Sequence, residues 1–103
     1  MREVDKAYAA GFFDGEGHVR CDLIKGYPHL VASASQVDPQ PLDWLKTLFG
    51  GRVYRTGDRR RTQGVFNWQV NTTDAYMFLD AVLPYLMVKK ADAEEAIKKW
   101  NER

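Results

Sequence analysis

Residues 8–17 read Tyr8-Ala9-Ala10-Gly11-Phe12-Phe13-Asp14-Gly15-Glu16-Gly17, and this stretch decides how the chain is organised. Its first six residues are apolar or small. Ala7, Ala10 and Gly11 fall on one face of a helix and leave almost no side chain there. Since a second backbone can approach such a face closely, we expect a helix–helix contact at this point.

The last four residues of the stretch are acidic and glycine-rich. Gly15 and Gly17 favour the end of a helix, so Asp14 and Glu16 are expected at the helix tip. A carboxylate held there is well placed to bind a metal ion if the helix meets a partner. Without a partner, Glu16 would be an ordinary solvated acid at a helix end.

At these residues the chain resembles a known family. Residues 9–17 look like the motif of the LAGLIDADG homing endonucleases, which often ends as Gly-Phe-Phe-Asp-Gly-Glu-Gly, with Ala9 as a conservative departure at the first position. The segment Leu83-Pro84-Tyr85-Leu86, followed by Lys89-Lys90, also resembles the end of such a domain. The resemblance therefore spans roughly the whole chain.

The composition predicts one globular domain, residues 1–103, with a core of moderate size. The hydrophobic fraction of 45% argues against disorder. No apolar run approaches membrane-spanning length, and the start at Met1 does not read as a signal peptide. The single cysteine, Cys21, excludes an internal disulfide. We therefore expect an intracellular, cytoplasmic location and no membrane partner.

The distribution of charge says more than the net charge of +1. The windows 18–37 and 52–71 hold seven Lys/Arg against two Asp, whereas the rest of the chain holds eight Lys/Arg against twelve acids. Both basic windows coincide with predicted strands. A basic sheet under acidic helices is a candidate phosphate-binding surface.

Periodicity and turn residues predict an α+β chain in the order αββαββα with one further terminal helix. The first predicted half is a helix at 6–15 capped by Asp5, followed by strands at 18–24 and 29–36 that the turn 25–28 joins. The second half begins with a helix that has Asp38 as its cap and Pro39 in its first turn and that ends at Gly50-Gly51, followed by strands at 52–56 and 65–71. A helix capped by Thr72 or Thr73 then runs to Leu83, and a last helix spans 89–100. The resemblance implies that the four strands form an antiparallel, saddle-shaped DNA-binding sheet with the helices on its other face.

The apolar positions of these elements predict the core. In the last strand Phe66, Trp68 and Val70 alternate with polar residues, as in a half-buried strand. Cys21 lies on the apolar side of the first strand and is most simply a core residue. The helices add Leu42, Leu45, Leu48, Phe49, Ala93, Ala96, Ile97 and Trp100.

One carboxylate binds a hard divalent cation poorly. The resemblance supplies the missing ligands, because motif helices of the family pack against each other and bring the last acid of each motif over a DNA backbone. It implies a homodimer in which two copies of Glu16, together with DNA phosphates, hold Mg²⁺ or Mn²⁺ and cleave double-stranded DNA. A symmetric dimer would prefer a palindromic or nearly palindromic site.

The resemblance also assigns roles to neighbouring residues. Gln36 falls where the family often has a polar residue that orders the active-site water. The family often has a lysine near the end of the last strand, whereas this chain has none between Gln69 and Thr73. Asn71 is the nearest polar substitute, and Lys25, Lys89 and Lys90 are alternatives. The expected dimer contact comprises Ala7, Ala10, Gly11 and Asp14, of which Asp14 is expected to be structural and to hydrogen-bond near the helix ends.

On a DNA-binding sheet, polar residues of the strands would read bases, and arginines near the loop would contact phosphates. The expected base-reading residues are Arg20, Asp22, Tyr27, His29, Ser33, Tyr54, Asn67 and Gln69. The expected phosphate contacts are Arg52, Arg55, Arg59, Arg60 and Arg61, and Lys25 completes the DNA-binding set. His18 and His29 lack a third ligand and are interpreted as surface residues.

Two alternatives to a homodimeric endonuclease stay open. The same fold could bind DNA or structured RNA without cutting it, which the missing lysine favours. The chain could instead assemble with a different chain, or be a remnant that has lost its activity. Members of the family are often encoded in introns, inteins or phage genomes, and the sequence does not choose among these hosts.

Overall fold

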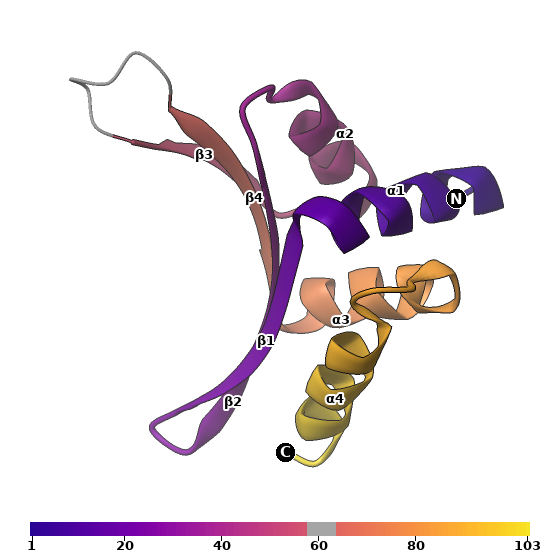
Figure 1. Cartoon of the computed structure of the whole chain (residues 1–103). Coiled ribbons are helices and arrows are strands. Elements are labelled where there is room, and N and C mark those ends of the chain that lie inside the picture. Colours follow the sequence, from indigo (N-terminus) through magenta and orange to yellow (C-terminus); the bar gives the residue numbers. More distant parts are fainter. Residues whose placement is uncertain (58–63) are drawn as a thin grey trace.

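The computed structural model describes residues 1–57 and 64–103 (Figure 1). The elements follow in the order α1 (Glu3–Glu16), β1 (Gly17–Ile24), β2 (Tyr27–Gln36), α2 (Gln40–Phe49), β3 (Arg52–Thr56), β4 (Val65–Asn71), α3 (Thr72–Val82), the short 3₁₀ helix η1 (Leu83–Tyr85) and α4 (Lys90–Asn101). The predicted α+β class and the predicted order of helices and strands are both confirmed. Within the described residues, no helix is both long enough and apolar enough to span a membrane.

The four strands form one antiparallel sheet in the order β1-β2-β4-β3. Strands β1 and β2 are joined by a two-residue turn, Lys25-Gly26, in which both residues have positive φ, 53° and 83°. Such a turn matches the twist of the strands it connects, and glycine tolerates the left-handed conformation at its second position. The hairpin is therefore tighter than the predicted turn at 25–28.

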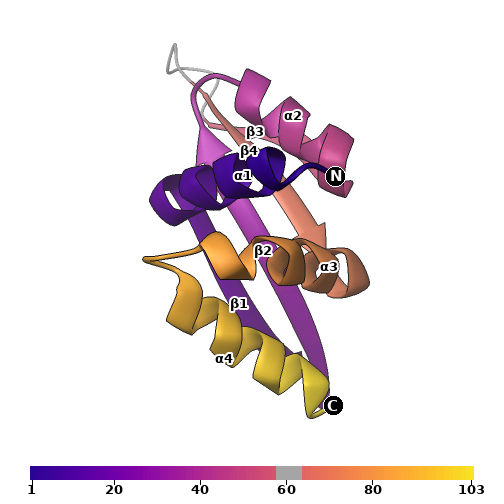
Figure 2. The same ribbon diagram turned by 90° about the vertical axis from the view of Figure 1, so that its right-hand side faces the viewer.

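All four α-helices of the described residues lie on one side of the sheet, and none of them covers the opposite side (Figure 1). Seen from the helical side, α1 and α3 run side by side across the middle of the sheet, with α2 and α4 towards its two ends (Figure 2). This layer of helices covers β2 and buries its small residues, so Ala32 and Ala34 have almost no exposed surface. Helices can approach a sheet closely where its side chains are small.

Aromatic side chains centred on Phe78 of α3 join the two layers. Its ring makes edge-to-face contacts with Phe13 of α1, Phe49 of α2 and Trp68 of β4, at centroid distances of 5.1, 4.8 and 4.9 Å. This edge-to-face geometry is the one that aromatic pairs prefer. The indole N–H of Trp68 donates to the carbonyl oxygen of Gly50 at 2.9 Å, so its polar atom is satisfied although the residue is buried. Most predicted core positions are confirmed: Phe49, Phe66 and Ile97 are half-buried against the core, and Leu48 is half-buried without belonging to it.

Cys21 also packs against this core from β1 and is half-buried. Desolvation raises the pKa of its thiol above the ordinary value, and Lys99 opposes part of that rise. The packing of Cys21 against the core agrees with the prediction that it is a core residue.

Helix starts differ from the sequence-based predictions. Helix α1 begins three residues early, so Asp5 lies inside it and pairs with Arg2 at 3.2 Å instead of capping it. Helix α3 begins at Thr72, and neither threonine is its cap, since Asn71 occupies that position without a side-chain hydrogen bond. For α2, the carboxylate of Asp38 accepts the N–H of Gln40 at 2.9 Å, as a capping residue would, although the helix begins after Pro39.

Helix α1 also runs past Gly15 and ends at Glu16. The glycine that ends it is Gly17, where an added Cβ atom would collide with the ring and the carbonyl oxygen of Phe13. Only glycine therefore lets the chain turn directly from the helix into β1 over a buried phenylalanine.

Replacing Phe78 with alanine should lower the free energy of unfolding by about 3–5 kcal/mol, because the cavity would remove the ring that contacts three others. Urea unfolding followed by tryptophan fluorescence measures this change. The neighbouring Met77, which is 63% exposed, is the matched control, and Met77→Ala should change the free energy by less than about 0.5 kcal/mol. Similar losses in both variants would contradict the central position of Phe78.

Candidate active site and nucleic-acid interface

One face of α1 is exposed along the whole helix. It comprises Val4, Ala7, Tyr8, Gly11 and Gly15, spaced three or four residues apart, and we refer to it as the α1 stripe. Val4 and Tyr8 are 63% and 61% exposed. At Gly11 and Gly15, an added Cβ atom would meet nothing within 4 Å. The stripe is therefore an uncovered surface on which another helix could lie close to the backbone.

Ala10 does not belong to this stripe. Its side chain has no exposed surface and belongs to the same buried cluster as Ala9 and Phe13. The prediction that Ala10 contacts a second copy is therefore wrong, because that face of α1 already packs inside the chain. Ala7 and Gly11 remain on the exposed side, as predicted.

The two acids of the motif have different surroundings. The carboxylate of Asp14 accepts the backbone N–H groups of Met87, Val88 and Lys89 at 2.8, 3.1 and 2.9 Å. Lys89 also donates from Nζ to the carbonyl oxygen of Asp14 at 3.1 Å, which places a cation at the negative end of the α1 dipole. Asp14 thus fastens the end of α1 to the segment that enters α4, as expected of a structural acid that hydrogen-bonds near helix ends.

Glu16, in contrast, is exposed. It is the last residue of α1, and within the described residues its side chain forms no hydrogen bond and no ion pair. No group of three or more His, Cys, Asp or Glu within residues 1–57 and 64–103 is arranged to hold a metal ion. One chain therefore presents a single uncommitted carboxylate at the end of the α1 stripe.

Of the two other predicted catalytic residues, only Gln36 lies near the end of α1. Gly17 pairs with Ala34, and Gln36 is two residues farther along β2, so its Cα is roughly 8 Å from that of Gly17 by strand geometry. The side chain of Gln36 accepts the N–H of Val37 at 2.8 Å.

Asn71 lies elsewhere on the sheet. It pairs with Val31, three residues before Ala34 and one strand farther from β1, so its Cα is about 14 Å from that of Gly17. The prediction that Asn71 replaces the active-site lysine is therefore wrong, since its short side chain cannot span that distance. Among the alternative lysines, Lys25 is at the hairpin tip, and Lys89 is bonded at the end of α1.

The uncovered side of the sheet, which we refer to as the open face, gathers the polar residues of the four strands. Strand pairing aligns Arg20 with Val31, Ser33 with Gln69, and Gln69 with Arg52, so that alternate residues share this side. The open face comprises His18, Arg20, Asp22, Ile24, Tyr27, His29, Val31, Ser33, Ser35, Arg52, Tyr54, Thr56, Val65, Asn67, Gln69 and Asn71. All eight predicted base-reading residues and Arg52 lie on it.

One predicted phosphate contact, Arg55, is not part of the open face. Arg55 pairs with Phe66, a helix-side residue, so strand alternation places Arg55 on the helical side of the sheet. Its expected phosphate contact near the loop therefore stays a prediction, outside the open face. Arg59, Arg60 and Arg61 fall outside the described residues.

Charges on the described open face are few. Arg20 pairs with Asp22 at 2.7 Å, and the guanidinium of Arg52 lies 4.7 Å from the centre of the Tyr54 ring. Lys25 stands beside this face at the hairpin tip. The open face is therefore chiefly a polar, hydrogen-bonding surface, and much of the basic surplus predicted from the sequence falls on the helical side or outside the described residues.

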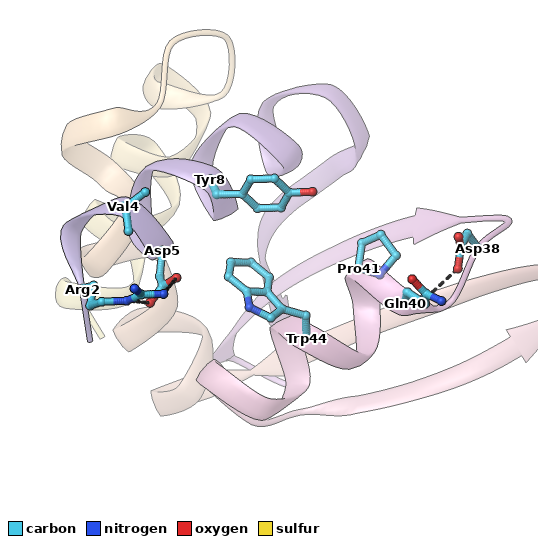
Figure 3. A pocket seen from close by; sticks show the side chains of 8 residues that line it. All are labelled: Arg2, Val4, Asp5, Tyr8, Asp38, Gln40, Pro41 and Trp44. Atoms are coloured by element: carbon cyan, nitrogen blue, oxygen red, sulfur yellow. Dashed lines mark hydrogen bonds and ion pairs between the residues drawn. The ribbon is translucent and has the colours of Figure 1, made fainter.

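A pocket of about 580 Å³ lies between the start of α1 and the start of α2 (Figure 3). Tyr8 and Trp44 both line it and contact each other edge to face, with ring centroids 5.2 Å apart and planes at 83°. Val4 and Pro41 extend its apolar lining, and Arg2, Asp5, Asp38 and Gln40 form its polar edge. Sequence reasoning missed this site, although Val4 and Tyr8 share the helical spacing of Ala7 and Gly11.

Comparison with solved structures identifies the fold. Residues of this chain superpose on the homing endonuclease I-CvuI, solved in complex with its target in the presence of calcium, with a TM-score of 0.79 over 96% of this chain and 67% of the other, at 24% identity. The fold is that of the LAGLIDADG homing endonucleases. The suspected resemblance is thereby confirmed at the level of structure.

Other structures with this LAGLIDADG fold give similar agreement. An archaeal intron-encoded homing endonuclease, I-Vdi141I, solved with DNA, matches at a TM-score of 0.73 and 20% identity, over 96% of this chain and 68% of the other. The LAGLIDADG meganuclease I-AabMI, bound to uncleaved DNA, matches at a TM-score of 0.73 and 22% identity, over 93% of this chain but only 36% of the other. No protein-family model and no curated protein matches the chain in sequence.

In this LAGLIDADG fold the contrast between the two motif acids can be measured. Asp14→Ala should lower the free energy of unfolding by about 2–4 kcal/mol, because three backbone N–H groups would lose a charged acceptor. Glu16→Ala is the matched control at the same helix end and should cost less than about 0.5 kcal/mol. Urea unfolding at one fixed protein concentration compares them, and a larger loss for Glu16→Ala would refute the assignment.

Proposed function

We propose that this protein is a sequence-specific endonuclease that cleaves double-stranded DNA as a homodimer. The observation that carries the proposal is the exposed carboxylate of Glu16 at the end of the α1 stripe, beside a companion acid, Asp14, that is committed to the fold. The LAGLIDADG fold and the neighbours solved with DNA support the same conclusion.

The α1 stripe supports a homodimer. Gly11 and Gly15 leave the helix backbone uncovered, and Val4 and Tyr8 expose apolar surface beside them. Two such stripes would bury each other in a symmetric contact and bring the two helix ends together. The pocket beside Tyr8 and Trp44 would then lie at the margin of the contact, where a partner side chain could fill it.

The residues of one chain fit half of a metal site. Glu16 offers carboxylate oxygens, which are the ligands that Mg²⁺ and Mn²⁺ prefer, but a single carboxylate binds such ions weakly. Two copies of Glu16 and the phosphate oxygens of DNA would complete the set. A divalent ion bound there would supply charge neutralisation at the scissile phosphate and an acidic water.

The open face would bind the DNA. Its width of four strands and its polar side chains suit contact with base edges in a major groove, where hydrogen-bonding patterns differ among base pairs. Lys25, at the exposed hairpin tip, is placed for a phosphate contact at the outer end of each half-site. A symmetric dimer would recognise a palindromic or nearly palindromic sequence.

A second candidate is a dimer of the same design that binds nucleic acid without cutting it. The absence of a lysine between Gln69 and Thr73 favours this candidate, because Asn71, about 14 Å from the start of β1, cannot take the place of that lysine. Lys89 argues against it, since its ammonium group lies at the end of α1. A cleavage assay with Mg²⁺ and Mn²⁺ on the DNA that the protein binds distinguishes the two candidates.

Glu16→Gln should abolish cleavage and leave DNA binding within about threefold of wild type, because it removes the ligand charge while keeping the shape of an exposed side chain. The substrate is DNA enriched from a random double-stranded library, tested for binding with Ca²⁺ and for cutting with Mg²⁺. Glu3→Gln, an exposed acid at the other end of α1, is the control and should cut normally. Normal cutting by Glu16→Gln would overturn the catalytic role.

Gly11→Leu should convert the dimer to a monomer without unfolding the chain, because Gly11 is exposed and an added Cβ atom there would meet nothing within 4 Å. Analytical ultracentrifugation measures the assembly, and circular dichroism the helix content. Glu94→Leu, which adds the same side chain to an exposed position of α4, should remain dimeric. A Gly11→Leu protein that stays dimeric and active would show that the α1 stripe is not the contact.

A further inference from the structure

Two amides on the open face, Asn67 and Gln69, occupy the middle of β4 and are candidates to read adenine. Each is half-buried and faces outward between β2 and β3. An amide reads adenine by donating to N7 and accepting from the N6 amino group, so it needs one N–H and one oxygen lone pair that the protein does not use. Their hydrogen bonds within the protein can therefore be compared directly.

Asn67 has no N–H left for a base. Its Nδ2 donates to Oγ1 of Thr56 at 2.9 Å and to the carbonyl oxygen of Val65 at 3.4 Å. Its Oδ1 accepts from Oγ of Ser35 at 2.6 Å. These bonds connect β2, β3 and β4 across the open face. A contact with N7 of adenine would require Asn67 to release one of them.

Gln69 keeps both the N–H and the oxygen lone pair that contact with adenine requires. Within the described residues, its Oε1 accepts only from the hydroxyl of Tyr54 at 3.3 Å, and its Nε2 donates only to Oδ1 of Asn71 at 2.9 Å. One N–H and one oxygen lone pair therefore remain. The same two bonds orient the amide, because one partner donates to its oxygen and the other accepts from its nitrogen.

The surroundings of Gln69 hold it in this orientation. Tyr54 is itself fixed by the guanidinium of Arg52, 4.7 Å from its ring centre. Ser33 and Arg52 are the cross-strand neighbours of Gln69, so it lies in the interior of the open face and not at its edge. A side chain that is oriented before binding loses less conformational freedom when it contacts a base.

We propose that Gln69 reads one adenine in each half-site, with Tyr54 and Asn71 as its positioning residues, and that Asn67 braces the sheet and reads no base. This inference rests on the proposed function, since it needs the open face to lie against DNA. It gives Asn71 a role on the binding surface in place of the catalytic one expected from the sequence.

The test selects binding sites from a random double-stranded DNA library with Ca²⁺, using the full-length wild type and three variants. Wild type should prefer adenine at one position of each half-site by roughly 10- to 100-fold. Gln69→Glu keeps the shape but offers only acceptors, so that position alone should change to cytosine, whose N4 amino group donates. Tyr54→Phe should weaken the preference for adenine at the same position, but adenine should remain the most frequent base there.

Asn67→Ala is the matched control on the same strand and face. It should lower the melting temperature, because Ser35 and Thr56 lose their partner, while every position of the selected site stays as in wild type. A Gln69→Glu protein that selects the wild-type site, or an Asn67→Ala protein that alters one position, would overturn this inference alone. If wild type enriches no DNA, the proposed function fails and the inference falls with it.

Discussion

The three hydrogen bonds to the carboxylate of Asp14 are the interaction on which the arrangement of this protein depends. They connect the end of α1 to a segment more than seventy residues later in the chain, where the 3₁₀ helix gives way to α4. Because α1 turns into β1 immediately after this point, the bonds fix the helical layer and the first strand at once. Glu16 can stay exposed at that junction because its neighbour two residues earlier holds the junction in place. Of the two acids of the motif, Asp14 therefore has a structural role, whereas the side chain of Glu16 stays exposed and free of hydrogen bonds within the described residues.

Much of the fold could be predicted from the sequence because the relevant signals are local. The alternation of Phe66, Trp68 and Val70 specifies a half-buried strand, and Gly50-Gly51 with positive φ at both residues ends α2 where predicted. The first residues of the helices were harder to predict. Asp5 and Thr72 are typical capping residues, but tertiary packing decides where α1 and α3 begin. Predicting the two-residue hairpin turn would have required the register of β1 against β2, which no single residue indicates.

The candidate site could be predicted only in part, because it depends on distances between strands. The motif correctly placed Asp14 and Glu16 at the end of α1, but the same helical spacing could not separate the buried Ala10 from the exposed Gly11. The resemblance suggested Asn71 as a catalytic residue beside Glu16, whereas the pairing of β4 with β2 places it far from the end of α1. The different hydrogen bonding of Asn67 and Gln69 was likewise invisible in the sequence, since both residues read equally well as polar strand positions.

The shape of the α1 stripe has a consequence for how an assembly of these chains would grow. A stripe that runs the length of one helix and contacts its own copy forms a two-fold contact, in which each surface is satisfied by the other. Such an assembly closes at two members and leaves no complementary surface for a third. Growth into open filaments needs two different surfaces that fit each other head to tail, and a self-complementary helix face does not supply them. The bare glycines of α1 would therefore limit the size of the assembly as well as create it.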